Sequence, residues 1–109
     1  MGNRGNIVFT TNNTEVGRFY SHWGRDSLLD VLVDALDSAY GRERWDDPNY
    51  LTAHIAKLMI ADGSLSGICF APMQDDGDDT YTVNLDKQTI TDHDGCLWAS
   101  YQEFIDGRS

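Results

Sequence analysis

The chain opens on two short segments whose hydrophobic pattern is typical of β-strands. Residues 7–10 form an apolar run that ends in threonine, 11–14 are turn-forming residues, and 17–23 alternate between apolar and polar positions. Alternation with period two indicates a half-buried strand, and the turn cluster lies where a hairpin needs one. The pattern therefore predicts an N-terminal β-hairpin.

A helix is predicted next. Apolar residues recur at helical spacing from 28 to 39 and form one stripe, with Asp26 or Ser27 as the expected N-cap and Gly41 as the expected C-terminal stop. The opposite, polar face carries three acidic residues: Asp30, Asp34 and Asp37.

A second helix is predicted from Asp47 to Gly63. Asp47 followed by Pro48 is a typical helix start, because proline is well tolerated at the first helical position, and Gly63 is a typical end. The residues expected on its buried face are Leu51, Ile55, Leu58 and Met59.

Beyond the helices the pattern returns to strands. Residues 65–71 are expected to form a buried strand closed by Pro72, and 81–85 and 88–91 a hairpin. Apolar residues at helical spacing from 97 to 105 predict a short C-terminal helix.

The predicted order is ββααβββα, and the predicted fold class is α+β. Two helices would pack on one face of a largely antiparallel sheet, with a short helix at the C-terminus. No linker, repeat or low-complexity tract interrupts residues 1–109, so a single domain is expected. No apolar run approaches the roughly 18 residues of a membrane span, and Met1 to Asn6 lack a secretory signal, so a cytoplasmic protein is expected.

Charge changes this picture more than any motif does. Eighteen acidic residues stand against eight basic ones, for a net charge of −10. Residues 58–109 hold ten acidic residues and only Lys87 and Arg108 as basic ones, so most of the negative charge lies in the second half. Such a field repels nucleic acid and membrane surfaces and favours a basic protein partner. The alternative is that the acidity serves solubility alone.

Two acidic, glycine-containing segments invite comparison with cation-binding loops. An EF-hand loop needs acidic ligands at its first, third and fifth positions, glycine at the sixth and glutamate at the twelfth. In 75–79 the glycine lies between two acidic pairs and no glutamate follows at the required spacing, and 92–95 fails in the same way. No metal ligands are therefore assigned, although 75–79 with His93 or His22 remains an alternative as a metal-binding or enzymatic site.

Other catalytic and cofactor signatures are missing from the sequence. It has no GxSxG, GxGxxG, P-loop or HExxH motif, and Cys69 and Cys96 are too far apart for a CxxC pair. No catalytic residue and no cofactor are predicted. The aromatic residues Tyr20, Trp23, Trp45 and Tyr50 are expected to cap a small core or to anchor an interface.

One resemblance covers most of the chain. The opening Met-Gly-Asn-Arg, the Tyr-Ser-His-Trp segment at 20–23 and the acidic loop 75–79 before a tyrosine-containing strand are similar to a family of short phage and prophage proteins of actinobacterial and related origin. The resemblance implies a mobile-element protein that acts in a host cytoplasm. By analogy with anti-CRISPR and anti-restriction proteins, carboxylates would be presented where a host enzyme expects nucleic-acid phosphates.

The resulting hypothesis is a non-enzymatic, anti-CRISPR-like inhibitor that binds a basic, nucleic-acid-processing host protein and contacts neither nucleic acid nor membrane directly. The alternatives are the metal-binding or enzymatic domain above and an accessory phage protein; the sequence does not predict an oligomeric state. The predicted partner-binding residues are Asp75, Asp76, Asp78, Asp79, Asp86, Asp92 and Asp94.

Overall fold

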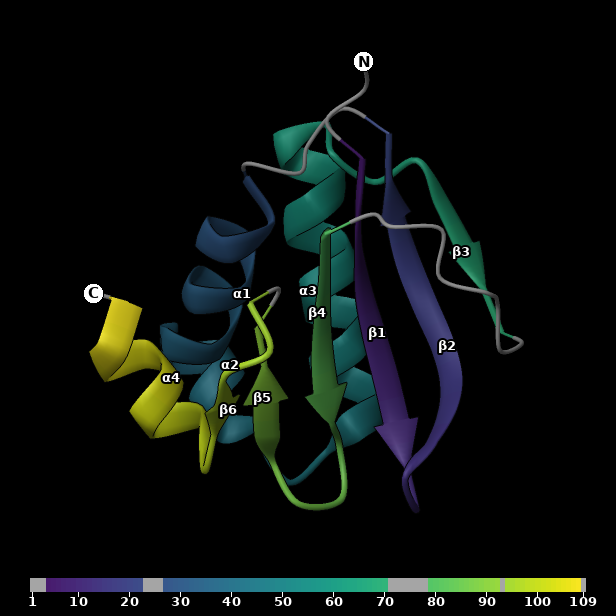
Figure 1. Ribbon diagram of the computed structural model, residues 1–109. Helices are drawn as coiled ribbons and strands as arrows, with labels where there is room; N and C mark the ends of the chain where they lie inside the picture. Colours follow the sequence, from purple (N-terminus) through teal and green to yellow (C-terminus); the bar gives the residue numbers. More distant parts are fainter. Residues whose placement is uncertain (1–3, 23–26, 71–78, 93, 109) are drawn as a thin grey trace.

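The centre of the structure is a mixed β-sheet, shown in Figure 1 for a computed structural model that describes residues 4–22, 27–70, 79–92 and 94–108. Its strands are β1 (Gly5–Thr11), β2 (Thr14–Ser21), β3 (Gly67–Cys69), β4 (Asp79–Asn84), β5 (Thr89–Thr91) and β6 (Leu97–Trp98). Their order across the sheet is β3-β2-β1-β4-β5-β6. Only the β1–β4 pair of this described sheet is parallel; the other neighbours are antiparallel.

The predicted N-terminal hairpin is confirmed. β1 and β2 pair from Gly5↔Ser21 to Thr11↔Thr14, and Asn12 and Asn13 form the turn with φ of 51° and 61°. Positive φ at both central residues matches the right-handed twist of the flanking strands, and asparagine tolerates that conformation better than most residues do.

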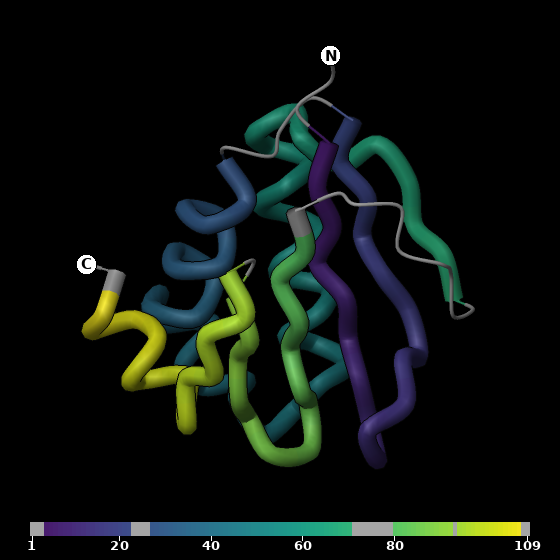
Figure 2. The backbone as a smooth tube through the Cα atoms, viewed as in Figure 1, coloured from purple at the N-terminus to yellow at the C-terminus, as the bar shows by residue number. Residues whose placement is uncertain are grey.

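Four helices of the described chain complete the fold: α1 (Leu28–Asp37), α2 (Ala39–Glu43), α3 (Pro48–Asp62) and α4 (Tyr101–Arg108). In Figures 1 and 2, α1 and α3 lie side by side behind the sheet, and α4 packs beside β6 and α1. The α+β class and the placement of two helices on one face are confirmed.

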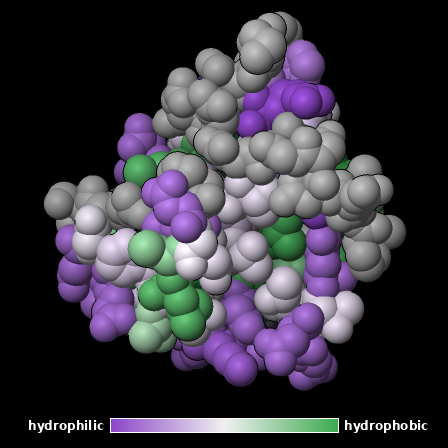
Figure 3. Space-filling model, viewed as in Figure 1, coloured by the Kyte–Doolittle hydropathy of each residue, from purple (hydrophilic) through white to green (hydrophobic). Residues whose placement is uncertain are grey.

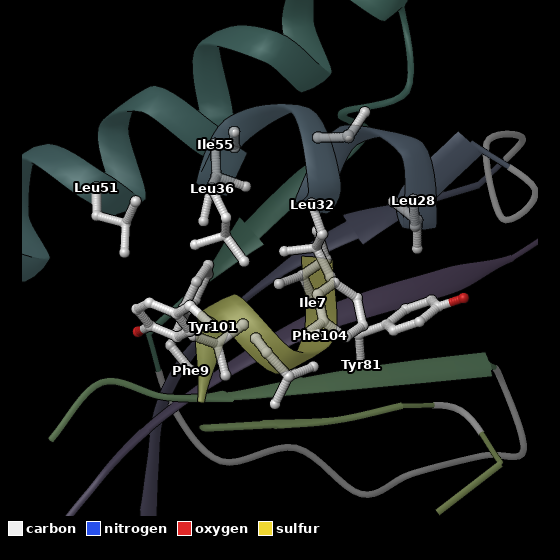
Figure 4. Close-up of a cluster of buried hydrophobic side chains, with 14 of the residues drawn as sticks. Ile7, Phe9, Leu28, Leu32, Leu36, Leu51, Ile55, Tyr81, Tyr101 and Phe104 are labelled. Atoms are coloured by element: carbon white, nitrogen blue, oxygen red, sulfur yellow. The ribbon is translucent and has the colours of Figure 1, made fainter. Parts of the chain in front are cut away.

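The core lies between the helices and the sheet (Figure 4). Leucines spaced along α1 point down onto side chains from β1 and β4, and α3 and α4 close the cluster from either side. Its labelled members are Ile7, Phe9, Leu28, Leu32, Leu36, Leu51, Ile55, Tyr81, Tyr101 and Phe104, all of them buried.

The α3 boundaries follow the sequence signals. Pro48 opens the helix, and Gly63 ends it with a φ of 79°, where its N–H donates to the carbonyl oxygens of Met59 and Ile60. Glycine adopts this left-handed conformation without steric cost, which explains why the helix ends here. Leu51, Ile55 and Met59 are fully buried, as predicted, whereas Leu58, the fourth residue predicted on this face, is only partly buried.

The end of the first helix was predicted wrongly. α1 ends at Asp37, and Gly41 lies buried inside the following short helix, α2. A Cβ at Gly41 would lie 1.6 Å from the carbonyl oxygen of Ala35, so glycine is needed for close approach of α2 to α1.

Two predictions for the second half also need correction. The strand predicted as buried, β3, is an edge strand paired only with β2 among the described strands, and Ile68 is 48 % exposed. The helix predicted from 97 begins at Tyr101, because Leu97 and Trp98 pair with β5 as β6. In both cases pairing with a neighbouring strand decides the structure of a short apolar segment. The spacing of its hydrophobic residues does not show which strand it pairs with.

Replacement of Leu36 by alanine tests the core assignment. Leu36 is fully buried beneath α1, so Leu36→Ala should lower the free energy of unfolding by about 2–5 kcal/mol in urea denaturation. The matched control is Leu97→Ala at a side chain 68 % exposed, which should cost less than about 1 kcal/mol. Equal stabilities of the two variants would show that the leucine stripe of α1 is not the core.

Replacement of Tyr101 by phenylalanine, unlike that of Leu36 by alanine, is not expected to lower the free energy of unfolding. The Tyr101 hydroxyl is buried with no hydrogen-bond partner in the described structure, and burial raises the pKa of this group. Since a buried hydroxyl without a partner costs free energy, Tyr101→Phe should leave stability unchanged or raise it by up to about 1 kcal/mol. A loss of more than that in thermal and urea unfolding would mean that the hydroxyl has a stabilising partner.

Candidate functional site

Helix α1 presents an acidic surface on the side away from the core. Asp30 and Asp34 are one helical turn apart and exposed, and neither pairs with a cation in the described structure. Residues at i and i+4 share a face, so the two carboxylates point the same way. The buried stripe of Leu28, Leu32 and Leu36 fixes this orientation, because it turns the aspartates outward.

The acidic surface continues from α1 toward α4 through a polar network. Arg42 Nη2 donates to Asp37 Oδ1, and Arg42 Nη1 donates to Gln102 Oε1 over 2.7 Å. Gln102 Nε2 donates in turn to Asp106 Oδ1 over 2.9 Å. This network joins α1, α2 and α4, and its single guanidinium neutralises only part of the local negative charge.

Three arginines of the described chain are engaged in contacts within the protein. Arg18, 8 % exposed, donates through Nε and Nη2 to both carboxylate oxygens of Glu15 over 2.9 Å. Arg42 is held by Asp37, and Arg44 lies between two tyrosine rings. These three guanidinium groups are therefore held by neighbouring side chains, and none of them pairs with Asp30 or Asp34.

The Arg44 guanidinium is sandwiched between Tyr40 and Tyr50, 4.9 and 5.1 Å from the ring centroids. Its Nε is buried and has no hydrogen-bond partner in the described structure. His54 packs against Tyr40 with the two rings tilted by 51°, and its Nε2 lies 3.1 Å from Ser38 Oγ. Burial, with a smaller contribution from Lys57, lowers the pKa of this histidine. Ser38 Oγ also accepts the Gly41 N–H, so these contacts stabilise the junction between α1, α2 and α3.

Of the four aromatic residues predicted as core caps or interface anchors, Trp45 and Tyr50 fall on opposite sides of that choice, and Trp23 lies outside the described residues. Trp45 packs edge-on against Tyr101 and donates its indole N–H to the Leu36 carbonyl, so it belongs to the core. Tyr50 is 55 % exposed and reaches the surface beside Arg44.

The structure describes the side chains of three of the seven predicted partner-binding residues. Asp75, Asp76 and Asp78 lie outside the described residues, as does the side chain of Asp79, the first residue of β4. The remaining three lie around β5: Asp86 before it, Asp92 directly after it and Asp94 beyond.

Asp92 cannot serve as a surface contact, which corrects its predicted role. The residue is 3 % exposed, and its Oδ1 accepts the backbone N–H groups of Asp94 and Cys96, both over 3.0 Å. Its Oδ2 accepts the Trp98 indole N–H over 3.2 Å. The carboxylate thus holds the turn between β5 and β6 in place.

Asp86 and Asp94 are exposed. Asp86 Oδ2 accepts the Asn12 N–H over 2.5 Å and so ties the β4–β5 turn to the β1–β2 turn. This bond uses one face of the carboxylate and leaves an exposed group at that end of the sheet. Asp94 lies beyond the opposite end of β5.

The sequence interpretation does not include Asp30 and Asp34 among its candidate contacts. Asp30 and Asp34 have i, i+4 spacing on the polar face of a predicted helix, but the larger charge excess lies in residues 58–109. The signal that could have identified them is the absence of a basic residue from the same face: no lysine or arginine lies between Arg25 and Arg42.

Chemistry at the remaining groups is limited in the described part of the chain. No three His, Cys, Asp or Glu side chains there gather closely enough to hold a metal ion. Cys69 is half-buried and Cys96 exposed, and His22 Nδ1 lies 3.1 Å from the Tyr20 hydroxyl. None of the described helices is long and apolar enough to cross a membrane.

Comparison of the chain with family models, with curated proteins and with solved structures finds no match.

Substitution of Asp92 tests its structural assignment. Asp92→Ala leaves two backbone N–H groups and an indole N–H without their acceptor, so it should lower the free energy of unfolding by at least about 2 kcal/mol. Asp62→Ala, at an exposed carboxylate with no partner in the described structure, should stay within about 0.5 kcal/mol of the parent. If Asp92→Ala unfolds at the same urea concentration as the parent, the structural role assigned to Asp92 is wrong and the residue is again a candidate partner contact.

Proposed function

We propose that this protein is a non-enzymatic inhibitor of a host defence system that binds a basic surface of a nucleic-acid-processing protein. The observation that carries the proposal is a difference between the basic and the acidic side chains of the protein. Arg18, Arg42 and Arg44 are engaged in internal contacts, whereas Asp30 and Asp34 point outward without a cation partner in the described structure.

The acidic α1 surface, defined by Asp30, Asp34 and Asp37, is the contact we assign first. Carboxylates one turn apart on a rigid helix present negative charge at fixed spacing, as a phosphate backbone does. A basic groove that binds nucleic acid would be attracted to this surface and steered onto it at low salt. Asp86, Asp94 and the acidic segment 75–79 extend the negative field and stay candidate contacts.

Direct binding to nucleic acid is not part of the proposal. A net charge of −10 opposes approach to a phosphate backbone, and Arg18, Arg42 and Arg44 are engaged in contacts within the described structure. The resemblance to short phage proteins supplies the biological setting, in which a protein of this size acts by stoichiometric binding.

The double variant Asp30→Asn/Asp34→Asn tests the α1 surface. It should fold with a melting temperature within a few degrees of the parent, because relief of like-charge repulsion offsets the lost charge at the helix N-terminus. In a bacterial strain that carries a CRISPR or restriction system, the parent should raise phage plating efficiency, and the double variant should lose roughly tenfold or more of that protection.

The matched control changes the same amount of charge elsewhere. Glu43→Gln/Asp62→Asn alters two exposed carboxylates that have no cation partner in the described structure, and it should retain protection. Equal losses in both double variants would mean that net charge matters and the α1 surface does not. No protection by the parent against any defence system tested would contradict the proposed function itself.

A further inference from the structure

An apolar groove lies between α3 and the edge of the sheet formed by β2 and β3. Its volume is about 400 Å³, within the range of pockets that hold small molecules. The sheet wall includes Phe9, Phe19 and Ile68, and the helix wall includes Ala53 and Ala56. Most of the lining is hydrocarbon, so water in the groove is easily displaced by an apolar group.

The groove exists because small residues face each other across it. Gly17 of β2 is part of the lining, and a Cβ there would crowd the Cys69 carbonyl oxygen at 3.1 Å and lie 3.7 Å from the Phe70 ring, so a larger residue would displace this wall of the groove. Across from the strands, α3 presents two alanines where larger residues would close the gap. The β1–β2 register also shifts beside Gly17, where Val16 is the extra residue of a β-bulge.

The rim of the groove is exposed and uncharged. Phe70 is 82 % exposed and Ile68 48 %, although both lie on the side of the sheet that carries the core. The longest stretch of the chain without Asp, Glu, Lys or Arg is 63–74, which includes β3. The one charged residue in the lining, Arg18, already binds Glu15 through two hydrogen bonds.

Two polar residues in the first turns of α3 complete the lining. Asn49 is exposed, and its side chain makes no hydrogen bond within the described structure. Thr52 Oγ1 donates to the Pro48 carbonyl over 2.8 Å, which leaves its oxygen able to accept. An apolar pocket with a few such polar groups binds an apolar body and orients one hydrogen-bonding group.

We propose that this groove binds an uncharged small molecule with an aromatic or branched aliphatic body and one hydroxyl or ring N–H, such as a phenol or an indole. A charged ligand does not fit, because the groove offers no ion-pair partner that is not already engaged. A second copy of the chain is disfavoured as the occupant, because each copy carries a charge of −10. The site is separate from the acidic α1 surface and does not depend on the proposed function.

The test uses 1-naphthol as the probe, with binding followed in ¹H–¹⁵N NMR spectra of the full chain. We expect saturable binding of one molecule per chain, with shifts at Gly17, Ala56 and Ile68. Naphthalene, which lacks the hydroxyl, should bind about three- to tenfold more weakly, and Asn49→Ala should reduce that difference.

A pair of alanine substitutions on α3 makes the test specific. Ala53→Phe places a ring in the groove and should weaken 1-naphthol binding by roughly tenfold or more, whereas Ala61→Phe, exposed on the same helix outside the lining, should leave it unchanged. Should Ala53→Phe fail to fold, Ala56→Leu tests the same wall.

Three results would overturn the inference. They are the absence of saturable 1-naphthol binding, equal binding by Ala53→Phe and Ala61→Phe, and a dimer seen by analytical ultracentrifugation that Ala53→Phe abolishes. The last would show that a second copy covers the groove. Loss of 1-naphthol binding without loss of phage protection would separate this site from the proposed function.

Discussion

The pairing of β1 on both of its sides is the constraint on which the rest of the structure depends. β1 binds β2 antiparallel through a two-residue turn and binds β4 in parallel. Parallel strands cannot be joined by a tight turn, so the chain must travel a long way between them. That connection contains α1, α2 and α3, and two of these helices cover one face of the sheet (Figure 1). Ile7 and Phe9 of β1 are buried beneath them.

The arrangement separates two surfaces of different chemistry. α3 lies between α1 and the β3 edge, so the acidic α1 surface and the apolar groove are on different sides of the helix layer (Figure 1). The sheet face seen in Figure 3 is largely pale and polar, with an apolar area over the β6 region, where Leu97 is exposed. A carboxylate on α1 and an alanine in the groove can therefore be changed independently, because neither contacts the other.

Local structure could be predicted from the sequence, and long-range placement could not. The turn at Asn12 and Asn13 and the start of α3 at Asp47 and Pro48 depend on the backbone conformations that these residues prefer. The sequence therefore predicts both the hairpin and the helix. The edge position of β3 depends on β2, and the burial of Asp92 depends on Trp98, which lies six residues later. The net negative charge could be counted from the sequence, but its excess lies in residues 58–109. Only the fold shows that Asp30 and Asp34 on α1 are exposed carboxylates without a cation partner in the described structure.

Native-state hydrogen exchange, measured residue by residue, tests the role of β1 most directly. If β1 organises the sheet, the amides of Ile7 and Phe9 should exchange only through global unfolding, and those of Ile68 and Cys69 in β3 should exchange faster through local opening. Exchange of β1 as fast as that of β3 would contradict this account, because a strand bonded on both sides cannot open before the edge does.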